Sequence, residues 1–585
     1  MRSAAALLAA PPGVDALHAI ARVAGCDGDV APLAADARAA LGLPDDLLDA
    51  RVCPGPGALR ALLLRSPRGA PPRETMARVA TKLAARTPQL LWIAIAEDDA
   101  AIERVIACWS AHRSPPRVAA LSVEREHLVD SDAEALCAIA AAAGADDLLT
   151  HARWLEVLGR DALTRRFYRE LEASVGSLGG SLPAVVPAED RRTLALHASS
   201  RLLFLAFLEA KGWLDDDRGF LARVHADTLL GGGAVHRRML DPLFFGTLNA
   251  RVAARAPAAR AFGRVPYLNG GLFTRTPLEK RWRHARFSDE ALAALFDGVL
   301  ARYRLTARED RATWSEAAVD PEMLGRAFET LMASRERRNS GAFYTPQPLV
   351  ADVTAEALAV ALTRCGLDEP AARRILAGER PVPDRAAELR ARLVALRVLD
   401  PACGSGAFLV HALERIAEIL RLCGDARDVG AVRREVLART IFGVDASATA
   451  VWLCELRLWL STVIETEVAP GERVPTLPNL DHNIRVGDSL GGEGFRGTQG
   501  PLHGSRTLAA LRARYARATG IRKHSLSRAL DRAERSAAVA ALEREIAALG
   551  HRRRELLLAR RQRDLFGERR RAGPDPERER LRARV

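Results

Sequence analysis

The sequence of 585 residues predicts an α/β fold, with an open parallel sheet in the second half of the chain. The segment 397–410, RVLDPACGSGAFLV, is typical of a short strand, a glycine-containing loop and the first turn of a helix. Two later apolar runs, 440–445 and 483–490, also predict strands, and each contains an aspartate near its carboxyl end. Helical periodicity separates these runs, and alternating strands and helices favour a parallel sheet. Such sheets bind nucleotide-like ligands at the carboxyl ends of their strands.

Four regions follow one another along the chain. Residues 1–150 mix strand and helix patterns and form an amino-terminal α/β region of unknown role. Residues 151–335 are mostly helical, and residues 336–490 contain the glycine loop with the three predicted strands. Residues 491–585 are rich in Arg, Glu, Ala and Leu and show no strand pattern, which predicts a basic helical insertion or tail.

The amino-terminal region contains two candidate strands, 90–96 and 118–123. The acidic run 97–99 follows the first strand and raises the alternative of a nuclease site. No Glu-x-Lys sequence follows on a neighbouring strand, so a solvated turn at the end of the strand is the favoured interpretation.

In the helical region, the apolar residues over 194–214 predict a buried or strongly amphipathic helix. The stretch 174–187 is rich in Gly, Ser and Pro and predicts a loop. Residues 266–273, PYLNGGLF, predict a turn between apolar anchors. Asp320 and Pro321 predict the cap and the first turn of another helix.

The chain is basic, with 86 Lys and Arg against 73 Asp and Glu and a net charge of +13. This balance favours a polyanionic partner such as nucleic acid. Frequent Arg and Ala are also typical of a GC-rich genome, which weakens the argument from charge.

The eight cysteines form no Cys-x-x-Cys pair, so neither a metal site nor a disulfide framework is predicted. Their scattered positions suit a reducing cytoplasm. The short apolar start of the chain is interpreted as an ordinary terminus and not as a signal peptide. We find no apolar run that we expect to span a membrane.

The glycine loop has the features of a ligand-binding turn. Gly404 and Gly406 lack Cβ atoms, so the backbone can turn sharply and come close to a ligand. No Lys follows the loop, which excludes a phosphate-cradling P-loop.

Three aspartates near the predicted strand ends suggest the ligand. Asp445, after the second strand, is placed to accept hydrogen bonds from two ribose hydroxyls. Its distance from the glycines is about twice the ~20 residues of dinucleotide folds, which weakens an NAD interpretation. Asp488 suits an exocyclic adenine amine, and Asp400 suits an ammonium group. Together they favour S-adenosylmethionine, although any one of them alone is more often a simple turn residue.

The sequence also resembles a known family. Asp400–Phe408, DPACGSGAF, resembles the S-adenosylmethionine loop of amino-methylating DNA methyltransferases. Gly341–Pro346, GAFYTP, resembles the segment that precedes this loop in gamma-type members and contacts the methionine part of the cofactor. The resemblance implies a class I S-adenosylmethionine-dependent methyltransferase domain, Rossmann-like in fold. The cofactor-binding residues that it and the three acids imply are Tyr344, Thr345, Pro346, Asp400, Ala402, Gly404, Gly406, Phe408, Asp445 and Asp488.

Two further segments, Tyr267–Phe273 and Pro321–Glu329, are similar to the helical region ahead of the cofactor domain in large adenine-specific methyltransferases. Such enzymes occur in restriction-modification and phage-defence systems, of the type IIG-like or BREX-like kind. The resemblance therefore implies methylation of adenine N6 in double-stranded DNA.

The chain departs from the family at the catalytic motif, Asn/Asp-Pro-Pro-aromatic, which orients the target amine of a flipped base. No such motif follows Asp488. The nearest string, Ser114–Arg117, precedes the glycine loop, has Arg in place of the aromatic residue, and is interpreted as a loop. We therefore expect no catalytic residue in this chain, an incomplete sheet, and an unprotected edge on the strand at 395–400.

This departure leaves several functions open. The chain is expected to be a truncated enzyme or half of a split methyltransferase that a second polypeptide completes. A non-catalytic DNA-binding or regulatory subunit is the alternative from another class. A methyltransferase of RNA or protein is less favoured, because the long helical lead-in and the order of the two motifs are typical of the DNA enzymes.

Overall fold

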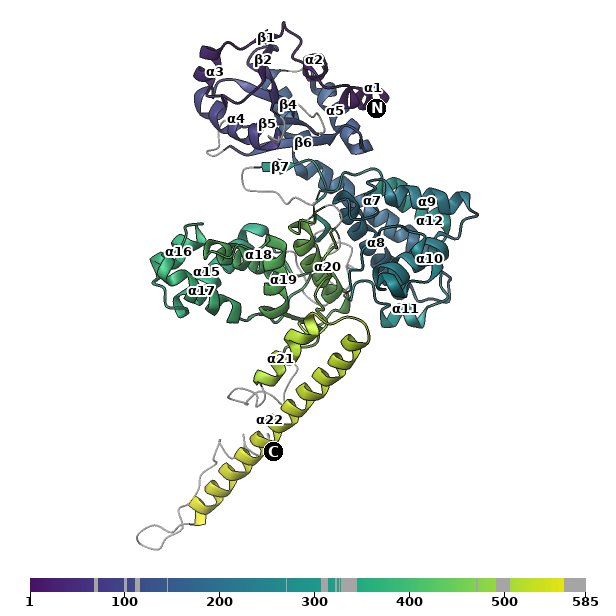
Figure 1. Cartoon of the computed structure of the whole chain (residues 1–585), viewed down its shortest axis with the longest axis vertical. Helices are drawn as coiled ribbons and strands as arrows, with labels where there is room; N and C mark the ends of the chain where they lie inside the picture. The colour runs from purple at the N-terminus through teal and green to yellow at the C-terminus, as the bar shows by residue number, and fades with distance from the viewer. Residues whose placement is uncertain are drawn as a thin grey trace. The chain divides into compact units, whose positions relative to one another are not determined.

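The computed structural model describes residues 1–67, 72–98, 103–110, 116–144, 146–269, 271–306, 314–320, 323–325, 327, 345–469, 472–490 and 505–561. The chain divides into two compact units (Figure 1). The first comprises Met1–Leu268, Leu272–Tyr344 and Trp459–Pro475, and the second comprises Asn269–Gly271, Thr345–Leu458 and Thr476–Val585.

The first unit contains a seven-stranded sheet whose strands lie in sequence order. The strands are β1 (Ala31–Pro32), β2 (Asp49–Pro54), β3 (Leu59–Ser66), β4 (Leu91–Asp98), β5 (Glu103–Trp109), β6 (Val118–Glu124) and β7 (Trp314–Glu316). Strand β3 runs parallel to β4 and β6 parallel to β7, while the other neighbours are antiparallel. The sheet is therefore mixed.

Both faces of this sheet are buried, since successive side chains of a strand point to opposite faces. In β4, Ile93 and Ile95 pack into one core with helices α1 (Arg2–Ala9), α2 (Val14–Val23), α5 (Asp130–Ala142) and α6 (Asp147–Leu158). Trp92 and Ala94 pack into a second core with α4 (Pro72–Arg86). A strand that is buried on both faces has a continuous apolar sequence, and this is why β4 could be predicted from the sequence.

The predicted strands at 90–96 and 118–123 are confirmed as β4 and β6. The solvated turn predicted at 97–99 is wrong for Glu97, which lies in β4. Its carboxylate is 3.0 Å from the guanidinium of Arg104 on β5, and both side chains are fully buried. The two residues are direct cross-strand partners, so this acid belongs to a structural ion pair.

The rest of the first unit is mainly helical. Its helices include α7 (Arg160–Ser181), α8 (Ala188–Ala210), α9 (Phe220–Leu230), α10 (Pro257–Arg260), α11 (Pro277–Arg281) and α12 (Asp289–Leu295), with short turns η1 (His236–Leu240), η2 (Pro242–Leu248), η3 (Val252–Ala254) and η4 (Phe296–Leu300). The helix predicted over 194–214 is confirmed as α8, whose residues from Leu194 to Leu208 are all buried.

By length and composition, α8 is long and apolar enough to cross a membrane, contrary to the prediction from the sequence. In the structure, 83% of its apolar window is buried, as in the core helix of a globular unit. The predicted loop at 174–187 is also largely wrong, because α7 continues to Ser181. A Cβ on Gly179 would lie 3.5 Å from the carbonyl oxygen of Arg191 in α8, so this glycine stands where the two helices pack closely.

Two other predictions in this region have a clear outcome. The turn at 266–273 is confirmed, with Asn269 at a φ of 60°, a left-handed conformation that asparagine tolerates. Asp320 acts as the predicted cap, because its Oδ1 accepts a hydrogen bond from the Met323 amide at 2.8 Å. Pro321 lies outside the described residues, as do Ser114 and Pro115.

The second unit contains three parallel strands in the order β10–β9–β8. These are β8 (Val398–Asp400), β9 (Ile441–Asp445) and β10 (Ile484–Val486), so all three predicted strands are confirmed, the last one ending before Asp488. The helices are α15 (Gln347–Arg364), α16 (Glu369–Leu376), α17 (Pro383–Ala395), α18 (Ala407–Leu422), α19 (Val429–Arg439) and α20 (Ala448–Ile464), the last of which belongs to this unit up to Leu458. Among the described strands, β8 and β10 form the two edges, and Leu399 of β8 is 62% exposed.

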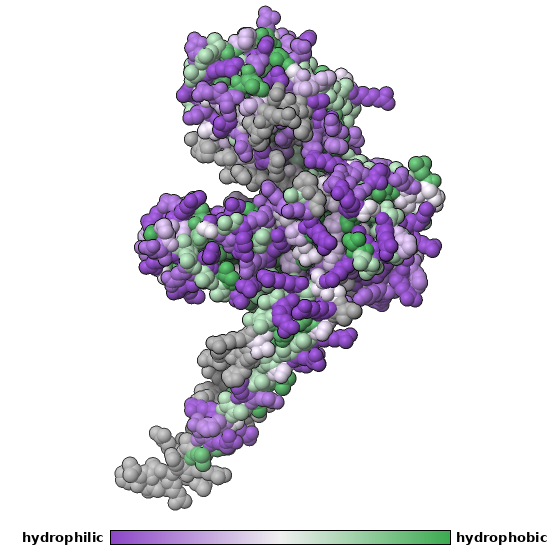
Figure 2. Space-filling model, viewed as in Figure 1, coloured by the Kyte–Doolittle hydropathy of each residue, from purple (hydrophilic) through white to green (hydrophobic). Residues whose placement is uncertain are grey.

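A helical hairpin follows, formed by α21 (Ser505–Ala516) and α22 (Ile521–Arg561), where the sequence predicts helix without strands. Tyr515 and Leu530 lie at the centre of its small core. Farther along α22, Ile546 is 69% exposed. Figure 2 shows apolar residues scattered among hydrophilic ones along this helix. Single exposed apolar side chains are ordinary on protein surfaces and need no special explanation.

Candidate functional site

The glycine loop joins β8 to α18, as predicted. Gly404 has a φ of 51° and Gly406 a φ of 87°, in the left-handed region that favours glycine. A Cβ on Gly406 would lie 2.7 Å from Sγ of Cys454 on α20, so Gly406 is needed for packing. At Gly404 no heavy atom of the described residues lies within 4 Å of the Cβ position, so this side of the loop is open there.

Asp445 fixes the glycine loop from the end of β9. Its Oδ2 accepts a hydrogen bond from the Gly404 amide at 2.9 Å, and its Oδ1 accepts one from the Ser447 amide at 2.8 Å. The carboxylate thereby ties together the loops after β8 and β9. Since each carboxylate oxygen accepts two hydrogen bonds, one acceptor position remains on each oxygen for a diol.

Asp400 ends β8, and its Oδ1 accepts a hydrogen bond from the Ala402 amide at 3.0 Å. Burial raises the pKa of this carboxyl group, the Ala402 hydrogen bond opposes the shift, and the negative charge of Asp445 raises it further. Two neighbouring carboxylates repel each other less when a cation lies beside them. This pair therefore suits the positively charged part of a ligand.

Asp488 lies two residues after β10 and is exposed, with its Oδ1 accepting a hydrogen bond from the Leu490 amide at 2.9 Å. The adjacent Ser489 hydroxyl donates to the carbonyl oxygen of Pro401 at 2.6 Å. The loop after β10 thus contacts the glycine loop. Hydrogen bonds therefore connect all three strand-end loops that carry the predicted acids.

The other predicted residues lie near this edge to different degrees. Ala402 is exposed within the glycine loop, and Phe408 is half-buried in the first turn of α18. Thr345 is half-buried, and Pro346 is the residue preceding α15, a helix that packs against α18. Tyr344 lies outside the described residues.

Two residues of the site were missed by the sequence analysis. Arg457 on α20 is 5% exposed, and its Nη1 donates to the carbonyl oxygen and to Oγ of Ser405, at 3.2 and 3.1 Å. Asn483 is buried, and its Nδ2 donates to three backbone carbonyls at the end of α19 and the start of β9. A lone Arg inside the apolar run 450–463 was the available signal for the first residue.

One cluster in the described chain has metal-ligand chemistry, formed by His482, Asp531 and Glu534. Arg485 occupies the place of a cation there, because its Nη2 donates to both Glu534 oxygens at 2.9 and 2.8 Å and to Nδ1 of His482 at 2.9 Å. The Arg512 guanidinium adds a further donor to Glu534 at 2.9 Å. These contacts fit a structural ion-pair network better than a metal site.

Comparison with known families gives a match over the same part of the chain. Residues 378–491 match the family described as the MmeI DNA-methyltransferase domain. This range contains β8, β9 and β10 together with the three loops.

Two curated relatives are bifunctional by name. The putative type II restriction enzyme and methyltransferase RM.MjaORFECS2P of Methanocaldococcus jannaschii is 29% identical over 335 residues, covering 52% of this chain and 28% of the relative. The type II restriction enzyme and methyltransferase RM.Eco57I of Escherichia coli is 35% identical over 106 residues, covering 16% of this chain and 11% of the relative. The chain thus spans little more than a quarter of the length of the first of these relatives.

Two solved structures overlap with the chain at low scores. The type IIL restriction-modification enzyme MmeI in complex with DNA has a TM-score of 0.37 and 19% identity, covering 56% of this chain and 40% of that one. The DrdV–DNA complex has a TM-score of 0.27 and 13% identity, covering 82% of this chain and 38% of that one. By the family match alone, residues 378–491 are similar in sequence to the DNA-methyltransferase domain of MmeI.

Proposed function

We propose that residues 345–490 bind S-adenosylmethionine as part of an adenine-specific DNA methyltransferase of a restriction-modification or phage-defence system. The observation that carries the proposal is the set of hydrogen bonds that links the loops after β8, β9 and β10 at one edge of the parallel sheet. There Asp445 holds the Gly404 amide at 2.9 Å, while space beside Gly404 stays open. The match of residues 378–491 to a DNA-methyltransferase family supports the same function.

In this proposal each acid recognises a different part of the cofactor. Asp445 accepts hydrogen bonds from the ribose hydroxyls, Asp488 from the adenine amine, and Asp400 faces the ammonium group. Thr345 and Pro346, with Tyr344, contact the methionine part, and Ala402 and Phe408 line the loop. The bound cofactor supplies an electrophilic methyl group for N6 of adenine in double-stranded DNA.

We infer that the residues that orient the target amine lie on a strand that adds to the sheet beside β8. No Asn/Asp-Pro-Pro-aromatic sequence follows Asp488 in this chain. An added strand beside β8 would cover Leu399, which is 62% exposed, and would bring its own end to the same edge. The eight cysteines are free thiols, and we propose that the chain acts in the reducing cytoplasm.

Asp488→Ala gives a sharp test of the adenine contact, because the side chain is exposed and its loss costs little stability. We expect S-adenosylhomocysteine to bind about tenfold more weakly to the variant, in line with one lost hydrogen bond to a charged group. S-inosylhomocysteine has no exocyclic amine and should bind both proteins equally. Calorimetry with both ligands measures the difference, and equal weakening of both would remove Asp488 from adenine recognition.

A second candidate function is that of a DNA-binding subunit without catalysis, which the net charge of +13 favours. The two functions differ in methyl transfer. Purified chain, double-stranded DNA and radiolabelled S-adenosylmethionine are incubated with and without the product of the adjacent gene. Labelled N6-methyladenine that depends on the second polypeptide supports the split enzyme. Cofactor binding with no transfer in either mixture supports the non-catalytic subunit.

A further inference from the structure

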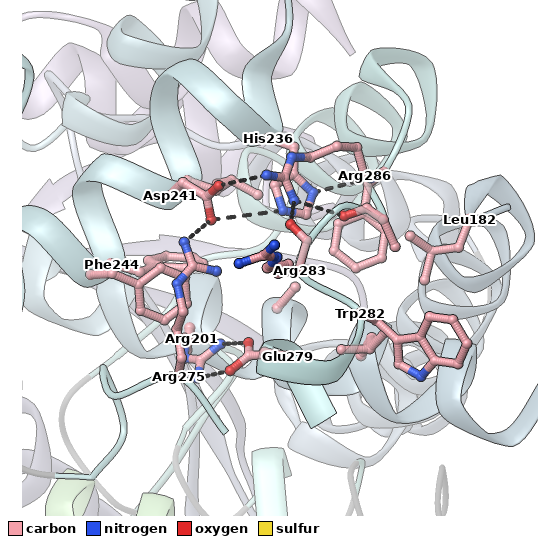
Figure 3. A pocket seen from close by; sticks show the side chains of 16 residues that line it. Leu182, Arg201, His236, Asp241, Phe244, Arg275, Glu279, Trp282, Arg283 and Arg286 are labelled. Atoms are coloured by element: carbon pink, nitrogen blue, oxygen red, sulfur yellow. Dashed lines mark hydrogen bonds and ion pairs between the residues drawn. The ribbon is translucent and has the colours of Figure 1, made fainter. Parts of the chain in front are cut away.

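The helical part of the first unit contains a small pocket between α8, the short helices η1 and η2, and the segment 275–287 (Figure 3). Its volume is about 40 Å³. Since one water needs roughly 10–15 Å³ measured in this way, the pocket has room for about three waters or one small anion. The side chains around it are mainly aromatic residues and arginines.

The floor of the pocket is the ion pair between Arg201 and Glu279. Arg201 is 1% exposed and donates to both carboxylate oxygens of Glu279 and to the carbonyls of Leu272 and Thr274. Burial alone would raise the pKa of Glu279, but the charge and hydrogen bonds of Arg201 lower it to about 2. Glu279 is therefore ionised and neutralised by Arg201, so the pair adds no net charge to the pocket.

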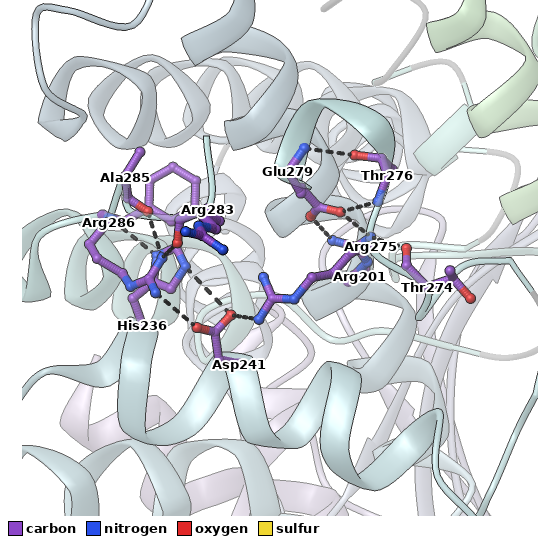
Figure 4. Close-up of polar contacts among 11 residues, drawn as sticks. Arg201, His236, Asp241, Thr274, Arg275, Thr276, Glu279, Arg283, Ala285 and Arg286 are labelled. Carbon is purple, nitrogen blue, oxygen red and sulfur yellow. Dashed lines mark hydrogen bonds and ion pairs between the residues drawn. The ribbon is translucent and has the colours of Figure 1, made fainter. Parts of the chain in front are cut away.

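The rim carries an excess of positive charge (Figure 4). Arg275 and Arg286 both face Asp241, at 2.9 and 3.4 Å, and Arg283 lines the same pocket. His236 adds no charge near neutral pH, because burial lowers its pKa to about 4 against the opposing effect of Asp241. Three guanidinium groups against one carboxylate leave a net charge of +2 at the rim.

Hydrogen-bond donors at this rim outnumber the acceptors within the described chain. Arg275 gives one hydrogen bond to Asp241 and lies 4.0 Å from the ring centroid of Phe245. Arg283 gives one, from Nε to His284 at 3.0 Å. Each guanidinium carries five donors. Arg286 shares Asp241 with Arg275 and also donates to the carbonyls of Arg283 and Ala285, at 2.7 and 2.9 Å. Arg283 is therefore the arginine of the rim that pairs with no carboxylate of the described chain.

We propose that this pocket binds a phosphate group through Arg275, Arg283 and Arg286. The planar guanidinium matches two phosphate oxygens at once, and arginine is the preferred partner where bidentate recognition matters. The volume admits the phosphate and leaves the rest of a ligand outside. The phosphate belongs either to the backbone of DNA or to a free nucleotide. The inference does not depend on the methyl transfer proposed above.

Calorimetry of the full chain with inorganic phosphate tests the site. We expect saturable binding that Arg283→Ala and Arg275→Gln each weaken at least fivefold. The exposed side chain of Arg283 bonds only its neighbour His284 among the described residues, and its carbonyl, which accepts from Arg286, is kept in the variant, so the fold is left intact. Arg237→Ala is the matched control, because this exposed arginine of η1 lies outside the pocket lining and carries the same charge.

Two further arms separate the sources of the phosphate. If DNA supplies it, Arg283→Ala lowers the slope of log affinity against log salt for a short duplex by about 0.9, and Arg237→Ala does so less. If a free nucleotide supplies it, adenosine monophosphate binds with an affinity that falls at least fivefold in Arg283→Ala, and the duplex slope is unchanged. Unsaturable heats with phosphate, or equal affinity in all three variants and the native chain, would overturn the proposal.

Discussion

The acidic edge of the parallel sheet and the basic pocket of the helical region use carboxylates in opposite ways. At the sheet edge, Asp445 and Asp400 accept hydrogen bonds from backbone amides and keep acceptor positions for a ligand. In the pocket, Glu279 and Asp241 accept from arginines, and donors remain in excess. The first arrangement suits a cation with hydroxyl and amine groups, and the second suits an anion. The predictions below test whether this contrast is real.

The largest expected effect is at the floor of the pocket. Arg201→Met leaves Glu279 buried without its main partner, which should lower the free energy of unfolding by about 3–5 kcal/mol. Urea denaturation of the first unit measures the loss. The double variant Arg201→Met with Glu279→Leu removes both charges and should recover most of the stability. A loss below about 1 kcal/mol in the single variant would show that the pair is not structural.

The two loop glycines should respond differently to alanine. In both variants the alanine is held in the left-handed conformation, which lowers the free energy of unfolding by about 1–2 kcal/mol. Gly406→Ala also places its Cβ 2.7 Å from Cys454 Sγ, whereas Gly404→Ala meets open space. We therefore expect a larger fall in melting temperature for Gly406→Ala, and a smaller fall accompanied by a loss of cofactor binding for Gly404→Ala. Equal melting temperatures would contradict the described packing of the loop.

Arg457 bonds the glycine loop and is not expected to contact the ligand itself, yet Arg457→Gln should weaken cofactor binding. The variant loosens the two hydrogen bonds to Ser405, and a typical net hydrogen bond contributes about 0.5–1.5 kcal/mol. The expected result is a three- to tenfold rise in the dissociation constant. Arg392→Gln, at an exposed ion pair on α17, is the control and should bind as the native chain does. No change in Arg457→Gln would show that the loop holds its shape alone.

A smaller effect is expected from the titration of Asp400. Its folded-state pKa is raised above 3.8, chiefly by burial, so the folded chain binds more protons than the unfolded chain in the window just above pH 3.8. Stability contributed by this group therefore falls as pH rises through that window. A cationic ligand favours the ionised carboxylate, so its affinity should rise over the same window. Asp400→Asn should flatten both trends, which melting and calorimetry between pH 4 and 7 measure.

The sequence predicted the acidic edge and missed the basic pocket for one physical reason. The glycine loop and its strand are contiguous, so local spacing places Gly404, Gly406 and Asp400 together. The pocket collects Arg201, Asp241 and Arg286 from separate helices and turns, and no local pattern predicts that meeting.

Other errors have the same origin in packing. Glu97 looked like a solvated turn residue because its partner Arg104 lies on a strand that was not predicted. Gly179 resembled a loop residue because close helix packing and turns both favour glycine. Arg457 stands in an apolar helix whose pattern predicts only burial. Strand positions follow from local pattern, whereas polar partners follow from tertiary contacts.

The central claim is that the edge formed by β8, β9 and β10 binds S-adenosylmethionine through Asp445. Calorimetry of the full chain with S-adenosylmethionine tests it most directly, comparing the native protein with Asp445→Asn. The asparagine keeps an acceptor for one loop amide, and melting without ligand checks that the fold is retained. We predict binding by the native chain that falls at least tenfold in Asp445→Asn. No binding by the native chain, or equal binding by both, would contradict the account.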